Sequence, residues 1–145
     1  MPFTVRRITL WRAEVDNKPG ALAAAIGPAA AAGADFTVLM GYRHAAAGGK
    51  AVIEVFPATG RKVAAAARAG GLNAAAIPTL LVEGDDKAGL GHRIAQGLAA
   101  EGINIAFMVA QVIGRKFAAV VGFEAEDDAR KAAVTLKKLA KAPKA

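Results

Sequence analysis

DNKPGAL, at residues 16–22, and DDKAGLG, at residues 85–91, are nearly the same turn written twice in one chain. Each turn follows a run of β-type residues and opens a segment rich in Ala and Leu or Gly. Three pairs of residues lie 69 positions apart, namely Asp16 and Asp85, Gly20 and Gly89, and Gly33 and Gly102. A fixed period that includes both ends of a helical segment predicts two copies of one supersecondary unit.

The segments between the turns predict the same order of elements in each copy. Leu90, Ile94 and Leu98 recur at the spacing of one helix face. Apolar runs and a second helical pattern follow, at 36–42, 51–56 and 61–69 in the first copy and at 103–113, 117–123 and 127–140 in the second. This order predicts an α+β fold of two tandem ferredoxin-like domains, 1–73 and 74–145, each an antiparallel sheet with its helices on one face.

A ferredoxin-like sheet needs a fourth strand in each copy. Residues 72–77 supply one for the first copy, before Pro78 ends it. Nothing comparable follows Leu139 in the second copy. We therefore expect the N-terminal segment, 3–7, to fold back and complete the second sheet.

Composition limits the chemistry that is open to the chain. Its 145 residues have 54% hydrophobic content, which is ample for packed cores. They include neither Cys nor Ser, which excludes the usual acyl-transfer nucleophiles and thiolate metal ligands. His44 and His92 stand alone, without the spacing of a metal pair. We expect a protein that is not an enzyme and that uses neither a cofactor nor a metal.

Charge and hydropathy bear on location and partners. The uncharged runs are shorter than a membrane span, and the N-terminus lacks the pattern of a signal peptide, so we expect a cytoplasmic protein without a membrane partner. The net charge is +7, and much of it comes from lysines near the C-terminus. These lysines follow an acidic stretch at 126–128, which is the charge order that a helix dipole favours. The basic balance therefore does not by itself indicate a nucleic-acid partner.

The ordered motif resembles the ACT domain, a small βαββαβ regulatory module that commonly binds amino acids. The resemblance rests on DNKPGAL followed by Gly-Ala-Asp-Phe at 33–36, and on Gly-Ile-Asn-Ile at 102–105 in the second copy. It covers nearly the whole chain as two copies. It implies a ligand at an interface between two such domains, contacted by the first loop and by the start of the second strand, where Asp35 and Asn104 lie.

The residues suit an amino-acid ligand on physical grounds as well. Free N–H groups at the start of a helix attract a carboxylate, and side-chain oxygens accept hydrogen bonds from an ammonium. Serine is disfavoured as the ligand because Val15 and Gly84 stand where some serine-binding members carry His. The candidate ligand-binding residues are Asp16, Asn17, Lys18, Pro19, Gly20, Ala21, Leu22, Asp35, Asp85, Asp86, Lys87, Gly89, Leu90, Gly91 and Asn104.

Other readings of the sequence remain open. The chain can be an interaction module without a ligand, such as a regulatory subunit that pairs with an amino-acid biosynthetic enzyme like acetolactate synthase. Exposed sheet edges also favour a homodimer. An RNA-binding reading needs stacking aromatics on the third strand, where Phe117 is followed by Ala119 and Gly122, so we expect no nucleic-acid partner. A dinucleotide site is disfavoured because Ile94 replaces the third Gly of the fingerprint.

Overall fold

The computed structural model describes residues 2–141. The strands are β1 (Phe3–Ile8), β2 (Trp11–Asp16), β3 (Val38–Arg43), β4 (Lys50–Phe56), β5 (Asn73–Ala74), β6 (Thr79–Asp85), β7 (Phe107–Ile113) and β8 (Lys116–Gly122). The helices are α1 (Ala21–Ala31), α2 (Arg61–Ala69), α3 (Leu90–Ala100) and α4 (Glu126–Lys141). These elements form two compact units and two four-stranded antiparallel sheets, so the predicted α+β class of tandem ferredoxin-like domains is confirmed.

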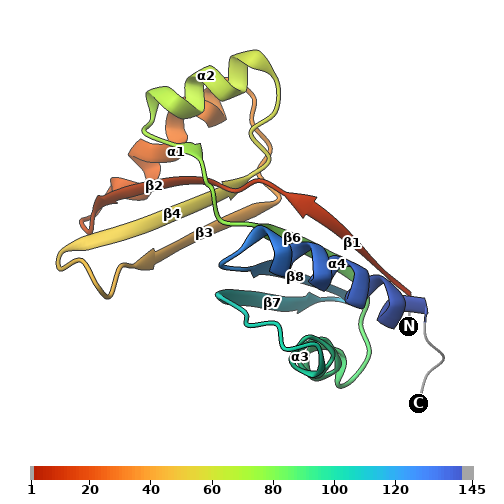
Figure 1. Ribbon diagram of the computed structural model, residues 1–145. Helices are drawn as coiled ribbons and strands as arrows, with labels where there is room; N and C mark the ends of the chain where they lie inside the picture. Colours follow the sequence, from red (N-terminus) through yellow and green to blue (C-terminus); the bar gives the residue numbers. More distant parts are fainter. Residues whose placement is uncertain (1, 142–145) are drawn as a thin grey trace. The chain divides into compact units, whose positions relative to one another are not determined.

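The first unit is Thr9–Ala76, and its strands lie in the order β3-β4-β2-β5. Both α1 and α2 lie on the same side of this sheet (Figure 1). Its core joins Trp11 and Val55 on the helix-facing side of the sheet to small helix residues such as Ala29 and Ala67. The guanidinium of Arg68 lies 5.2 Å from the centre of the Trp11 ring, which completes the packing on that side. Trp11 is therefore a core residue of this unit.

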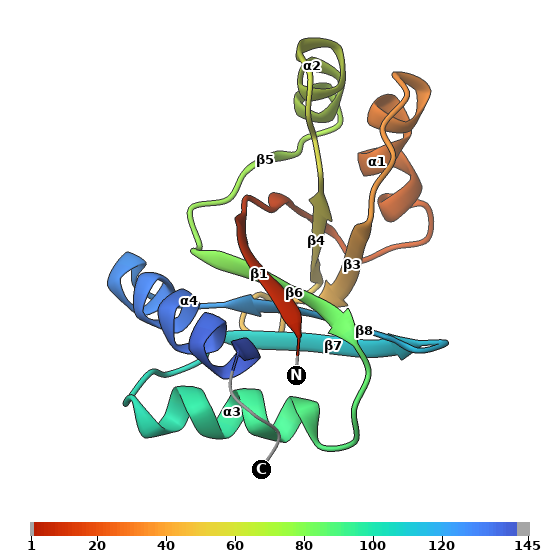
Figure 2. The ribbon, with the colours of Figure 1, turned by 90° about the vertical axis from the view of Figure 1, so that its right-hand side faces the viewer.

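The second unit joins Met1–Ile8 to Ile77–Ala145, with strands in the order β1-β6-β8-β7. Figure 2 shows α3 and α4 on one side of this sheet. The N-terminal strand pairs antiparallel with β6, from Phe3 opposite Gly84 to Ile8 opposite Thr79. The expectation that the N-terminus completes the second sheet is thus confirmed. The compact units consequently differ from the contiguous division at residue 73, because the first strand belongs with the second half of the chain.

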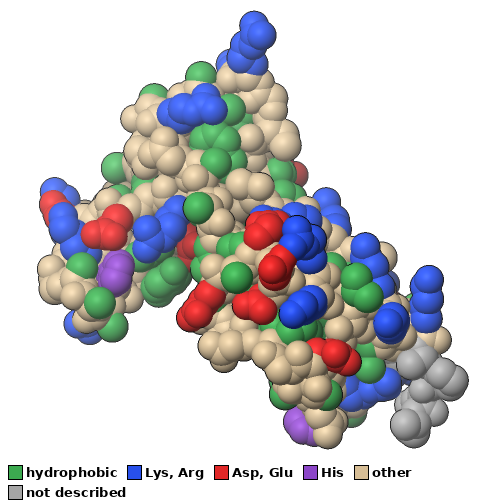
Figure 3. Space-filling model, viewed as in Figure 1, with side chains coloured by type: hydrophobic (Ala, Val, Ile, Leu, Met, Phe, Trp, Pro, Cys, Tyr) green, Lys and Arg blue, Asp and Glu red, His purple; other side chains and the backbone are tan. Residues whose placement is uncertain are grey.

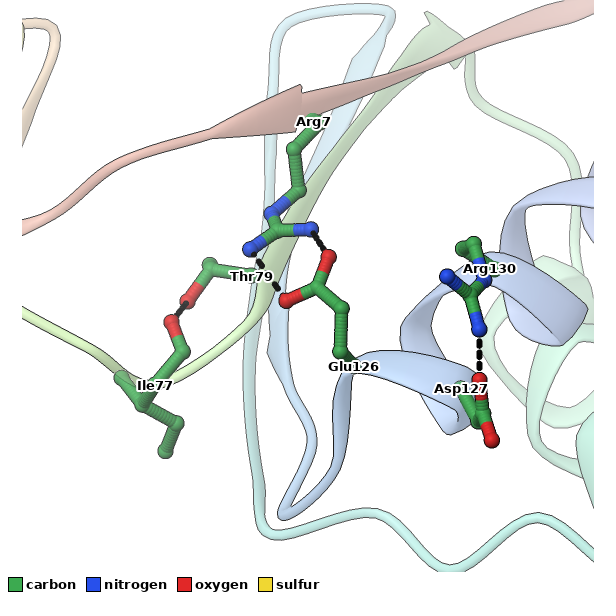
Figure 4. A network of polar contacts seen from close by, with 6 residues as sticks. All are labelled: Arg7, Ile77, Thr79, Glu126, Asp127 and Arg130. Atoms are coloured by element: carbon green, nitrogen blue, oxygen red, sulfur yellow. Dashed lines mark hydrogen bonds and ion pairs between the residues drawn. The ribbon is translucent and has the colours of Figure 1, made fainter.

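An ion pair holds this first strand to the last helix. Arg7 on β1 donates two hydrogen bonds to the carboxylate of Glu126, the first residue of α4 (Figure 4). The hydrogen bond from Arg7 lowers the pKa of Glu126 below its ordinary value, and the same hydrogen bond raises the pKa of Arg7. Asp127 and Arg130 form a second pair within the first turn of α4. The N-terminal strand is therefore held by polar contacts as well as by its ladder.

Two strands begin later than the sequence pattern predicts. β3 starts at Val38 and β7 at Phe107, so Asp35 and Asn104 lie in irregular segments before these strands and not at their first residues. The physical reason is the length of the neighbouring strands. β4 ends at Phe56 and β8 at Gly122, so no strand extends far enough to pair with the earlier residues. The predicted fourth strand at 72–77 is likewise reduced to β5, two residues long.

Among residues 2–141, none of the helices combines the length and the apolar character that a membrane crossing requires.

Candidate functional site

The two repeated turns have the same backbone structure. In the first, the N–H of Asn17 donates to the carbonyl of Gly49 at 2.8 Å, and in the second the N–H of Asp86 donates to the carbonyl of Arg115 at 2.8 Å. α1 and α3 each begin one residue after a glycine in the left-handed region, Gly20 with φ 88° and Gly89 with φ 84°. An L side chain is strained at such a φ, so glycine is what lets both turns close at this point.

The acidic side chains of these turns bind lysines and do not cap the helices. Neither helix has a side-chain hydrogen bond at its start, so neither Asp nor Asn caps the first N–H groups. Asp16 accepts a hydrogen bond from Lys50 at 2.7 Å, and Asp85 accepts one from Lys116 at 2.6 Å. In both cases the lysine lies opposite the carboxylate in the strand ladder. These lysines lower the pKa of both carboxyl groups.

Part of the predicted N–H cradle is used within the loop itself. Ala21 donates to the carbonyl of Lys18 at 3.2 Å, and Leu90 donates to the carbonyl of Lys87 at 3.0 Å. The next N–H groups of α1, those of Leu22 and Ala23, have no protein acceptor among residues 2–141. Helix starts leave such groups open to solvent or ligand. The cradle in the first copy therefore begins at Leu22, two residues after Gly20.

The first turn borders a cavity of about 310 Å³ within the Thr9–Ala76 unit. The β2–α1 turn, β3 and β4 line it through Val15, Asp16, Asn17, Lys18, Ala21, Leu22, Gly41, Tyr42, Arg43, Ala51, Val52 and Ile53. This volume lies at the lower end of the range for small-molecule pockets. In Figure 3, charged side chains of both signs gather at the end of the unit where β2 ends and the β3–β4 hairpin turns.

A buried carboxylate lies on β4, one of the strands that line this cavity. Tyr42 on β3 donates its hydroxyl hydrogen to Glu54 on β4 at 2.6 Å, and Glu54 is only 2% exposed. Burial of the phenol, followed by its hydrogen bond to the carboxylate, raises the pKa of Tyr42 to about 12. The phenol consequently stays protonated at neutral pH and remains a hydrogen-bond donor. This pair fixes the position of a strand that lines the cavity.

The other half of the predicted site lies at the far end of each unit. β2 and β3 both pair antiparallel with β4, so they run in the same direction. Asp16 ends β2, whereas Asp35 precedes β3 after the whole length of α1. The loop at 85–91 and Asn104 are separated by α3 in the same way. Asp35 and Asn104 are both exposed. Within one unit, therefore, the loop and the second-strand residue do not meet.

Among residues 2–141, no group of three or more His, Asp or Glu side chains could hold a metal ion.

No family model matches the sequence, and no curated protein matches it. Solved structures do match. A protein from Bacteroides thetaiotaomicron gives a TM-score of 0.76 at 16% identity, over 93% of this chain and 90% of that one. The aspartokinase alpha and beta subunits give 0.61 at 16% identity, over 95% and 96%. The regulatory subunit of aspartate kinase from Thermus thermophilus gives 0.62 at 12% identity, over 95% and 96%.

The chain has a tandem ACT-type fold. At identities this low, the similarity to these structures shows the fold and does not identify a ligand. The predicted ACT resemblance agrees with the strand order in both units and with the regulatory subunits among the similar structures.

Sequence reasoning missed one wall of the cavity in this ACT-type unit. Tyr42 and Arg43 both line the cavity, although neither is among the predicted site residues. The prediction also left out Ala51 on the neighbouring strand. One signal was available, because Glu54 is a charged residue in the middle of an otherwise apolar strand, AVIEVF. Such a residue in a central strand needs a polar partner nearby, and Tyr42 is that partner.

Proposed function

We propose that the protein is a non-catalytic cytoplasmic regulatory protein that binds a small amino acid at the β2–α1 turn. The observation that carries this proposal is the cavity bordered by Asp16, Asn17, Lys18, Ala21 and Leu22, five of the predicted residues. Its volume suits a metabolite of this size. The cavity combines groups that match both ends of an amino acid.

The carboxylate of the ligand binds near the open N–H groups of Leu22 and Ala23, at the positive end of α1. The amide oxygen of Asn17 accepts a hydrogen bond from the ammonium. Asp16 contributes less as an acceptor because Lys50 already occupies one of its oxygens. Pro19 and Gly20 shape the turn without contacting the ligand through polar side chains.

We propose further that the ligand is shared with a second subunit of a homodimer. Support comes from the distance between the turn and Asp35 within one unit, since α1 runs from one to the other. A ligand that touches both kinds of residue needs a second subunit to complete its site. Ligand binding then favours the assembled state by linkage.

Isothermal titration of the full chain with each of the twenty amino acids tests the proposal. We expect one of them to bind, and Asn17→Ala to weaken that binding by roughly tenfold, the loss expected for one hydrogen bond to a charged group. Thr4→Ala is the matched control, because Thr4 is exposed on β1, away from the cavity. Absence of heat with all twenty would rule out amino-acid sensing.

A second candidate is a regulatory subunit that contacts an amino-acid biosynthetic enzyme without a ligand of its own. The similarity in fold to a regulatory subunit of aspartate kinase favours it. Stoichiometric co-purification with such an enzyme, without any response to amino acids, would support this alternative. RNA binding has less support, because Phe117 is 6% exposed and belongs to a hydrophobic core. It cannot stack on a base from there.

A further inference from the structure

The two ACT-type units differ in bulk at the place where the cavity lies. Ala51 in the first unit pairs with Val15, and in the second unit Phe117 pairs with Gly84 at the same position of the ladder. The helix that follows begins at Ala21 in the first unit and at Leu90 in the second. Two alanines are thus replaced by Phe and Leu, and the glycine opposite Phe117 offsets only part of that volume.

Burial shows the consequence of this exchange. Leu90 is 1% exposed and Phe117 is 6% exposed, and both belong to the core of their unit. Ala21 and Ala51 instead line the open cavity of the first unit. The extra carbons of Leu90 and Phe117 occupy the space that the first unit leaves free. The repeated turn DDKAGLG is therefore retained with its backbone geometry while the space beside it is filled.

The charge of the residues that line the open cavity also differs from that of the equivalent positions in the second unit. Lys18 and Arg43 line it, and among residues 2–141 neither forms an ion pair. The lining carboxylate, Asp16, is already neutralised by Lys50. Arg43 lies opposite Ala51 in the ladder, and the residue opposite Phe117 in the second unit is Val112, which has no charge. Lys87 matches Lys18 in the second copy, so the difference in charge between the two turns comes from Arg43, which Val112 replaces.

We propose that each chain holds one ligand, in the Thr9–Ala76 unit, and that this ligand is an acidic amino acid with a second carboxylate. The inference rests on the proposed function and specifies its site and ligand class. One carboxylate pairs with Arg43, which can hold it through two parallel hydrogen bonds, and Lys18 adds a second positive charge. The DDKAGLG turn keeps its structure without taking a ligand.

Isothermal titration of the full chain with L-aspartate, L-glutamate, L-asparagine and L-glutamine tests this proposal. We expect one site per chain and an affinity for an acidic amino acid at least tenfold above that for its amide. Arg43→Val, which copies the second unit, should abolish that preference. Val112→Ala, at the equivalent exposed position of the second unit, should leave it unchanged.

Ala51→Phe provides the steric test and should abolish binding of the acidic amino acid. Ala21→Leu copies the second unit on the opposite wall and should weaken binding in the same direction. Fluorescence of Trp11, the only tryptophan, reports whether each variant is folded. If the Ala51 and Ala21 variants do not fold, Arg43→Val still tests the proposal, because Arg43 is exposed on an edge strand.

Two sites per chain, equal affinity for acids and amides, or an unchanged preference in Arg43→Val would each overturn the inference. Binding of a neutral amino acid that depends on Asn17 would preserve the proposed function and reject only the acidic class. No response to any amino acid would reject the proposed function as well.

Discussion

Tyr42 and Glu54 show how one polar pair can hold an edge strand in place. The carboxylate is buried on β4 and accepts the hydroxyl hydrogen of the phenol on β3. The raised pKa of Tyr42 has a definite sign for stability. The phenol is neutral in both states below its ordinary value of 10.0, and the folded state becomes less stable as pH rises from there toward about 12.

Spectrophotometric titration of the phenol measures this effect without ambiguity, because Tyr42 is the only tyrosine. We expect the folded protein to ionise near pH 12 and the unfolded protein near pH 10.0. Glu54→Gln removes the negative charge beside the phenol, so the folded pKa should fall toward 10.0. A variant that titrates like the unaltered protein would show that burial alone sets the value.

The glycines at the helix starts allow a second test at single residues. Gly20→Ala and Gly89→Ala should each destabilise the fold by about 1 kcal/mol, because an L residue is strained at a positive φ. No neighbouring atom lies within 4 Å of an added Cβ at either position, so strain is the only cost. Gly91→Ala is the control inside α3, where φ is not positive and no atom lies within 4 Å of an added Cβ, and it should stabilise by up to about 1 kcal/mol. Urea unfolding measures all three variants.

At the level of elements, β1 gives the second unit both a strand of its sheet and two residues of its core, Phe3 and Val5. Val5 faces the core of that unit and is 8% exposed, whereas the adjacent Thr4 points away and is exposed. Val5→Asp should therefore cost about 3 kcal/mol or more, since it removes apolar burial and places a charge in the core. Thr4→Asn, on the other face of the same strand, should change the urea midpoint little. Equal effects at the two positions would contradict the role of β1.

The helices and the strand order could be predicted because their signals are local and repeated. The helix at 61–69 has the predicted bounds, and the return of the N-terminus followed from the missing fourth strand. The starts of β3 and β7 could not be predicted, because they depend on where β4 and β8 end. The cavity could not be predicted either, since it depends on the small size of Ala51 across the ladder from Arg43.

On the scale of the whole molecule, three carboxyl groups link stability to pH. The pKa values of Asp16, Asp85 and Glu126 are lowered by Lys50, Lys116 and Arg7. A lowered pKa stabilises the fold above the ordinary values of 3.8 and 4.5, and this contribution is lost as pH falls through the folded values. The urea midpoint should consequently fall on acidification below pH 4.5.

Lys50→Met and Lys116→Met test this linkage at two of the pairs. Each should flatten the pH dependence, and added salt should do the same because all three pairs are exposed. Lys62→Met is the control, since Lys62 is exposed and forms no ion pair among residues 2–141. A control that flattens the profile equally would point to net charge as the cause.

The order of β1 and its partner along the chain has a consequence for synthesis. β1 leaves the ribosome before β6, which follows only after all of Thr9–Ala76 has been made. The middle unit, whose strands are contiguous, can fold during translation while the first residues wait unpaired. If it does, a newly made chain passes through a stage in which the Thr9–Ala76 unit is folded and β1 still lacks its partner β6. At that stage the backbone of β1 is open to a chaperone or to a second nascent chain.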